Sequence, residues 1–145
     1  MHDNKGDAIS DTIVANNTIV RNGGTGIQIG VNAGTGNVIA NNLLAENGWR
    51  EGLRQIRIIT GSSNLIANNV VWSSNPTRVG IAAEVTTNTL TGNLENDPLF
   101  VTPYTDLHLR AGSPAIGAAL PAYRPVIDYD GRTRDGSPDI GALER

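Results

Sequence analysis

The fold is decided by the stretch Asn37-Val-Ile-Ala-Asn-Asn42, which returns almost unchanged as Asn64-Leu-Ile-Ala-Asn-Asn69. Two further copies read Thr12-Ile-Val-Ala-Asn-Asn17 and Asn88-Thr-Leu-Thr-Gly-Asn93, so successive copies lie 25, 27 and 24 residues apart. Self-similarity at a nearly fixed period indicates a repeat architecture, in which each repeat is one supersecondary unit that packs on its neighbours.

Each repeat contains short strands. Apolar, mostly β-branched residues recur at every second position of the copies, which is typical of strands and not of helices. A second block recurs between the copies as Gly26-Ile-Gln-Ile29, Gln55-Ile-Arg-Ile58 and Gly80-Ile-Ala-Ala83. Three short strands per repeat predict one coil of a three-sided, right-handed, single-stranded parallel β-helix. The fold class is therefore all-β, with about three to four stacked coils, because one coil cannot close a core alone.

Stacking the copies predicts three inward columns of apolar side chains. These are Val14, Ile39, Ile66 and Leu90; Ile19, Leu44 and Val71; and Ile27, Ile56 and Ile81. The fourth copy has Glu95 where the second column would continue, so the pattern fades there. We expect residues 1–96 to form the coils and 97–145 to form a cap or wrapping segment within one structural domain. Six of the seven prolines lie in that segment, which disfavours long regular ladders.

The last residue of each copy is an asparagine. The column consists of Asn17, Asn42, Asn69 and Asn93. Asparagine tolerates left-handed φ, which a sharp bend between strands requires. Its side-chain amides can also hydrogen-bond along the axis as a ladder. The column is therefore predicted to be a structural ladder at one corner.

Both halves of the sequence resemble known β-helix proteins. The repeat is similar to those of the pectate-lyase-like superfamily. The tail resembles the C-terminal region of many bacterial β-helix proteins through Asp97-Pro-Leu-Phe100, Gly112-Ser-Pro-Ala-Ile116, Asp128-Tyr-Asp-Gly-Arg132 and Asp139-Ile-Gly-Ala-Leu-Glu144. It departs from that pattern at Gly117, where the family usually has Asp. The resemblance implies association with polysaccharides and a secreted or cell-surface location.

The coils lack a recognisable catalytic set. β-Helix glycosidases place several carboxylates around one glycosidic bond, but residues 12–93 hold only Glu46, Glu51 and Glu84, in no common register. Lys5 is the only lysine that could serve as a lyase base. We therefore expect no catalytic residues and a non-catalytic module, either carbohydrate-associated or structural. The alternative is the C-terminal part of a polysaccharide lyase or glycoside hydrolase acting on acidic polysaccharide.

One loop region is the candidate ligand site. Residues 47–54 are longer than the matching loop at residues 22–25 and contain Trp49 and Arg54. Arg57 should project from the following strand, and Arg78 precedes the equivalent strand one coil later. Trp49, Arg54, Arg57 and Arg78 suit stacking on a sugar ring and pairing with an acidic saccharide. The alternative is that Trp49 packs the loop down and the arginines are solvated.

A metal site is not expected, although Asp128–Asp135 resembles a short calcium loop in which Arg132 and Arg134 could neutralise the carboxylates. His108 is expected to be an isolated, exposed strand position. The net charge of −3 and the lack of a basic cluster favour neither nucleic acid nor membrane partners. The chain has no cysteine, and its N-terminus lacks the apolar stretch of a signal peptide.

Self-association is the expected partner interaction. Residues 1–7 contain no apolar residue besides Met1, so they should not cover the first coil. An open coil exposes strand edges and apolar interior. We expect a homo-oligomer through this N-terminal coil, about a two-fold axis.

Overall fold

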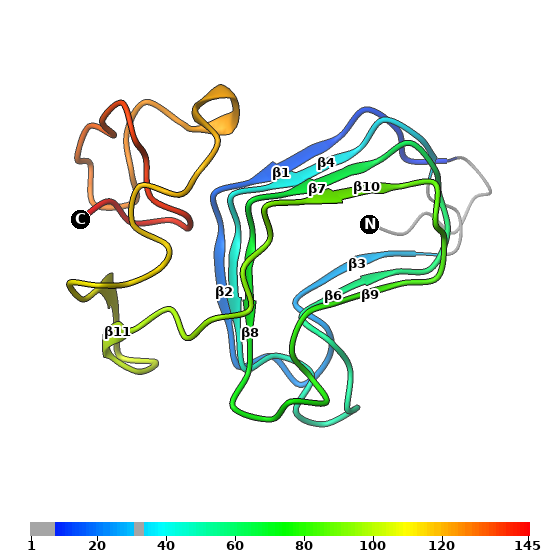
Figure 1. Cartoon of the computed structure of the whole chain (residues 1–145), viewed down its shortest axis with the longest axis horizontal. Coiled ribbons are helices and arrows are strands. Elements are labelled where there is room, and N and C mark those ends of the chain that lie inside the picture. The colour runs from blue at the N-terminus through cyan, green and yellow to red at the C-terminus, as the bar shows by residue number, and fades with distance from the viewer. Residues whose placement is uncertain (1–7, 31–33) are drawn as a thin grey trace.

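The computed structural model describes residues 8–30 and 34–145 and shows a nearly all-β chain wound as a parallel β-helix of about three turns (Figure 1). The predicted fold class is confirmed. Three parallel sheets form its sides. The first contains β1 (Ile13–Ala15), β4 (Val38–Ala40), β7 (Leu65–Ala67) and β10 (Thr89–Thr91); the second β2 (Thr18–Val20), β5 (Leu43–Ala45) and β8 (Val70–Trp72); the third β3 (Ile27–Ile29), β6 (Ile56–Ile58) and β9 (Ile81–Ala83).

The register of the strands confirms the three inward columns. Val14 pairs with Ile39, which pairs with Ile66, and Ile66 pairs with Leu90. The other two columns run in the same way, and Ile29 and Ile58 also pack in this core. Leu90 remains 43% exposed because it belongs to the last strand of its sheet. No helix in the described part of the chain is long and apolar enough to cross a membrane.

The predicted asparagine ladder is confirmed, with one correction to its backbone. Asn42 Oδ1 accepts from both Asn17 N (3.0 Å) and Asn17 Nδ2 (2.9 Å). The pattern repeats from Asn42 to Asn69 and from Asn69 to Asn93. The left-handed residue is the one before the ladder asparagine. The positions concerned are Asn16, Asn41, Asn68 and Gly92, with φ between 49° and 62°. The bend comes first and turns the next side chain into the ladder.

Two further ladders run along the other corners and were not predicted. Asn37 donates through N and Nδ2 to Asn64 Oδ1, and Asn64 does the same to Asn88. At the third corner the ladder runs through Asn22, Asn47 and Gln55. The first of these was visible in the sequence, since Asn also opens three of the four copies.

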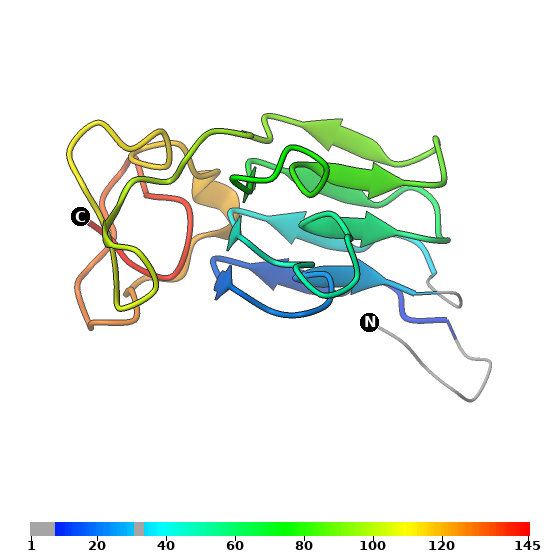
Figure 2. The same ribbon diagram turned by 90° about the horizontal axis from the view of Figure 1, so that it is seen from below.

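The C-terminal segment lies beside the solenoid, against the outer face of the β2–β5–β8 sheet (Figures 1 and 2). It contains the antiparallel pair β11 (Phe100–Thr102) and β12 (Asp106–Leu109) and a 3₁₀ turn, η1 (Pro121–Tyr123). A second apolar core forms between sheet and segment; its buried members are Leu43, Ala45, Val70, Phe100, Leu109, Ala115, Ala119 and Ile140. The middle sheet is therefore apolar on both faces, as expected for a strand layer covered on both sides.

Candidate functional site

The loop that carries Trp49 is held by the loop of the preceding coil. Gly48 N donates to Asn22 O (2.9 Å), and Arg50 N donates to Gly23 O (3.0 Å). Trp49 Nε1 donates to Arg21 O at 3.2 Å, yet the residue remains 54% exposed. The indole is thus fixed at its N–H while much of its ring faces solvent. Figure 1 shows this loop and the next one, residues 73–80, extending outward at the corner between the β2–β5–β8 and β3–β6–β9 sheets.

Another arginine of this loop, Arg50, lies over the Trp49 ring and was not predicted as a site residue. The Arg50 guanidinium carbon is 5.1 Å from the centroid of the Trp49 ring, within the range of a cation–π contact. Arg50 is exposed, as is Arg54 in the same loop. The adjacent Trp49 and Arg50 in the sequence could have indicated this contact.

Arg54 and Arg57 continue this surface onto the third sheet. Arg54 Nη1 donates to the carbonyl of Val79 in the neighbouring loop. Arg57, in the middle of β6, pairs through Nη2 with Glu84 Oε1 at 2.9 Å. The Arg57 side chain is 34% exposed and that of Glu84 48%, so the pair is accessible to water and to ligands.

Arg78 is directed elsewhere. Its Nη2 lies 3.3 Å from Glu46 Oε2, and the two side chains are only 16% and 11% exposed. Glu46 also accepts from Ser73 Oγ and from Ser74 N, each at 2.8 Å. Burial acts to raise the pKa of Glu46, but the hydrogen bonds from Ser74 and Ser73 and the charge of Arg78 outweigh it and lower the pKa. Trp49, Arg54 and Arg57 therefore follow one another on one loop and its strand, whereas the guanidinium of Arg78 is engaged with Glu46.

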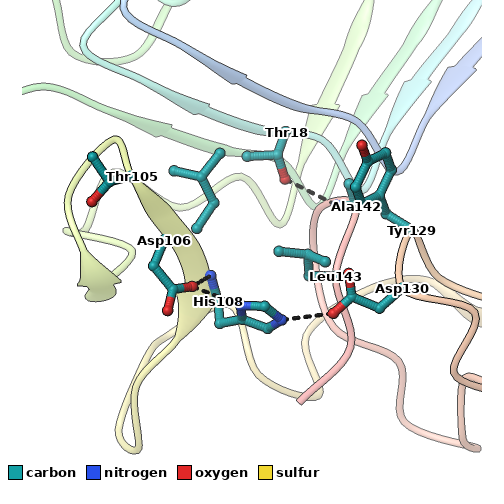
Figure 3. Close-up of a pocket in the computed structure, with 9 residues that line it drawn as sticks. Thr18, Thr105, Asp106, His108, Tyr129, Asp130, Ala142 and Leu143 are labelled. Carbon is teal, nitrogen blue, oxygen red and sulfur yellow. Dashed lines mark hydrogen bonds and ion pairs between the residues drawn. The ribbon is translucent and has the colours of Figure 1, made fainter.

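A second concave region lies between the C-terminal segment and the first coil (Figure 3). It is a hollow of about 390 Å³. One wall is Asp106, Leu107 and His108 of β12; the opposite wall holds Tyr129 and Asp130. The remaining lining residues are Thr18, Thr105, Ala142 and Leu143. The Tyr129 side chain is an open aromatic surface there, since the residue is 85% exposed.

His108 bridges the two walls of this hollow. Its Nδ1 lies 2.6 Å from Asp106 Oδ1, and its Nε2 lies 2.8 Å from Asp130 Oδ2. The hydrogen bonds with Asp106 and then Asp130 raise the pKa of His108, and the bond from His108 lowers the pKa of Asp106. The expectation of an isolated histidine was wrong, because the chain brings Asp130 across from 22 residues away. The i, i+2 neighbour Asp106 was the signal in the sequence.

In the acidic loop at residues 128–135, Asp128 and Arg134 bond to other groups of the protein. Asp128 accepts from Arg132 N (2.7 Å) and Glu144 N (2.8 Å), and Arg134 pairs with Glu144 at 2.8 Å. Burial acts to raise the pKa of Asp128, but backbone hydrogen bonds, chiefly from Glu144 and Arg132, lower it overall. Within residues 8–30 and 34–145, no group of three or more His, Cys, Asp or Glu residues is placed to hold a metal ion.

No protein-family model, curated protein or solved structure matches this chain. The assignment as a parallel β-helix is therefore based on the strand register and the side-chain ladders of this chain. The similarity to pectate-lyase-like proteins remains a resemblance of short motifs.

Proposed function

We propose that this chain is a non-catalytic β-helix module that binds acidic saccharides on the β3–β6–β9 side through Trp49, Arg54 and Arg57. The observation that carries the proposal is Trp49: its N–H is fixed on Arg21 O, while 54% of the residue stays exposed. An aromatic ring held in place but open to solvent is suited to stacking on a sugar ring, because little conformational freedom remains to be lost on binding.

The arginines supply the charge for an acidic sugar. Guanidinium groups pair with carboxylates in a bidentate geometry, which gives both strength and direction. Arg57 is already paired with Glu84, but an exposed ion pair contributes only about 0–1 kcal/mol. A saccharide carboxylate can therefore replace Glu84 at small cost. Arg78 supports the site indirectly, since its carbonyl accepts from Gln55 Nε2 (2.9 Å) next to β6.

Binding of oligogalacturonate and of alginate oligomers, measured by titration calorimetry, tests this function. Trp49→Ala and Arg57→Ala should each weaken binding by about tenfold or more, corresponding to about 1.4 kcal/mol. Arg124→Ala, which removes an exposed arginine from the C-terminal segment, is the matched control and should bind normally. Binding should weaken with added salt. The proposal fails if no acidic oligosaccharide binds, or if the two variants bind like the control.

A second candidate function is catalytic, as in the alternative of a lyase or hydrolase fragment. It is favoured by the hollow in which Asp106, His108 and Asp130 meet, because these are the residue types of general acid–base catalysis. In this arrangement both His108 nitrogens are engaged by carboxylates, so the imidazole is not free as a base. Release of reducing ends or unsaturated products from uronate polymers, abolished by Asp130→Asn, would establish this function.

A further inference from the structure

The end of the solenoid formed by β9 and β10 is open. In Figure 2, no part of the described chain lies beyond β10 at that end. Leu90 points into the interior column yet is 43% exposed. A hollow of about 300 Å³ lies there, and its apolar lining comes from Val71, Ile81 and Leu90. The apolar interior of the last coil is therefore accessible from the end.

At this end, Glu95 lies in an inward column whose other members are apolar. Leu94 bridges Val70 in parallel, and Val71 N donates to Leu94 O at 2.8 Å. Glu95 thus follows Val71 in the column that begins with Ile19 and Leu44. Its carboxylate lies against the backbone of the third side, since a Cβ at Gly80 would be only 2.6 Å from Glu95 Oε1. A carboxylate therefore stands beside the apolar hollow.

The asparagine ladders give the two ends opposite hydrogen-bonding character. In each step between coils, the earlier asparagine donates through N and Nδ2 to the Oδ1 of the asparagine in the next coil. At the last coil, the backbone N–H groups of Asn88 and Asn93 find no acceptor among the residues described. At the first coil, the Oδ1 atoms of Asn17 and Asn22 accept no hydrogen bond from residues 8–30 or 34–145. The last coil thus presents donors and the first coil presents acceptors.

We propose that the open end around Leu90 is a self-association surface that fits the first coil of a second copy of this chain, stacked head to tail, and that Glu95 opposes this contact. Head-to-tail stacking would place Asn93 under Asn17 of the partner copy and continue the ladder, whereas a two-fold contact would set like groups against each other. Among the residues described, Glu95 forms no ion pair, although Arg54 Nη1 also lies near the Cβ position of Gly80 (3.7 Å). Stacking buries the Glu95 carboxylate, and burying a charge without a directly paired partner is costly. An inward-pointing charge is one way in which sheet proteins prevent strand addition.

This inference changes the expected geometry of self-association. A contact through the N-terminal coil was expected about a two-fold axis, and residues 1–7, on which that expectation partly depends, lie outside the described residues. The polarity of the ladder instead offers that coil a partner at the opposite end. A head-to-tail contact repeats without closing and therefore leads to open chains of subunits.

Sedimentation velocity and light scattering test the role of Glu95. Glu95→Leu should associate as concentration rises at neutral pH, with a mass at least twice that of the monomer. Wild type and the control Glu51→Leu, which removes an exposed loop carboxylate, should associate less at the same concentration. Circular dichroism confirms that the variants are folded. If Glu95→Leu is folded and sediments like Glu51→Leu, the proposal is wrong.

Two blocked variants test the head-to-tail geometry. In the Glu95→Leu background, Leu90→Lys places a charge on the last coil and Asn17→Lys places one on the first. Each protein alone should remain monomeric, and an equimolar mixture should form heterodimers and nothing larger, because each retains one free end. A dimer of the Leu90→Lys protein alone would reveal a contact between first coils and would overturn head-to-tail stacking.

Discussion

Asn41 and Leu120, 79 residues apart, exchange two hydrogen bonds: Asn41 Nδ2 donates to Leu120 O at 2.9 Å, and Leu120 N donates to Asn41 Oδ1 at 2.7 Å. The coils above and below repeat part of this contact, since Asn68 Nδ2 donates to Ala118 O and Asn16 Nδ2 to Tyr123 O. The paired asparagines of the repeat thus have different roles. The second builds the internal ladder, and the first, in the left-handed conformation, holds the C-terminal segment on the solenoid.

We expect Asn41→Gly to loosen this segment while preserving the bend. Glycine adopts the left-handed φ of 57° without strain, so the variant isolates the loss of the side chain. Two hydrogen bonds are removed, so the Leu120 amide loses its acceptor and the Leu120 carbonyl keeps only the bond from Tyr123 N (3.2 Å). This loss should cost about 1–3 kcal/mol. Urea unfolding measures the loss. Asn96→Gly, at an exposed position, is the control. An equal loss of stability in both variants would show that the Asn41–Leu120 hydrogen bonds do not stabilise the fold.

Asn42→Leu tests the internal ladder. Asn42 is fully buried and links Asn17 to Asn69. Leucine removes the Oδ1 acceptor of Asn17 N and the Nδ2 donor to the carbonyls of Val14 and Ala40. Asn69 Oδ1 keeps the backbone N–H of residue 42. The free energy of unfolding should fall by about 1–3 kcal/mol for this loss of buried hydrogen bonds. Thermal unfolding, monitored by circular dichroism, measures this loss of stability. An unchanged melting temperature would show that the ladder contributes little to stability.

The inward columns and the first ladder were predictable because the strand register is fixed by local alternation and by the 24- to 27-residue spacing. Contacts made by the C-terminal segment were not predictable in this way. The Asn41–Leu120 and His108–Asp130 hydrogen bonds join residues that do not occupy equivalent positions of the repeat. Arg78 shows the same limit. Its position in the loop was predictable, but its pairing with Glu46 depends on side-chain direction at a corner where Glu46 has a φ of 55°.

The two ion pairs near the proposed saccharide surface should differ in their effect on stability. Arg78→Ala leaves Glu46 with its side chain 11% exposed and without its charged partner, which should cost about 1–3 kcal/mol. Arg57→Ala removes an accessible pair with Glu84 and should change stability by less than about 1 kcal/mol. Chemical denaturation of both variants compares them directly. Equal losses would mean that the burial of the Arg78–Glu46 pair has no energetic consequence.

The bridge of His108 should make the attachment of β12 depend on pH. Because the folded pKa of His108 is raised, protonation favours the folded state. This contribution is complete below the unfolded pKa of about 6.5 and is lost as the pH rises through the raised folded value. The pKa of Asp106 is lowered, so its contribution is instead lost as the pH falls through that lowered value.

We therefore expect His108→Gln to remove a fall in stability that the wild type shows as the pH rises above about 6.5. Denaturation curves at successive pH values measure this fall, and an NMR titration of the His108 ring gives its pKa directly. The only other histidine is His2, so His2→Gln is the matched control and should keep the pH dependence of the wild type. Asp130→Asn should lower the pKa of His108 by removing one of its two carboxylate partners, while Asp106 still holds the other nitrogen. An NMR pKa for His108 at or below 6.5 in the wild type would contradict the bridge.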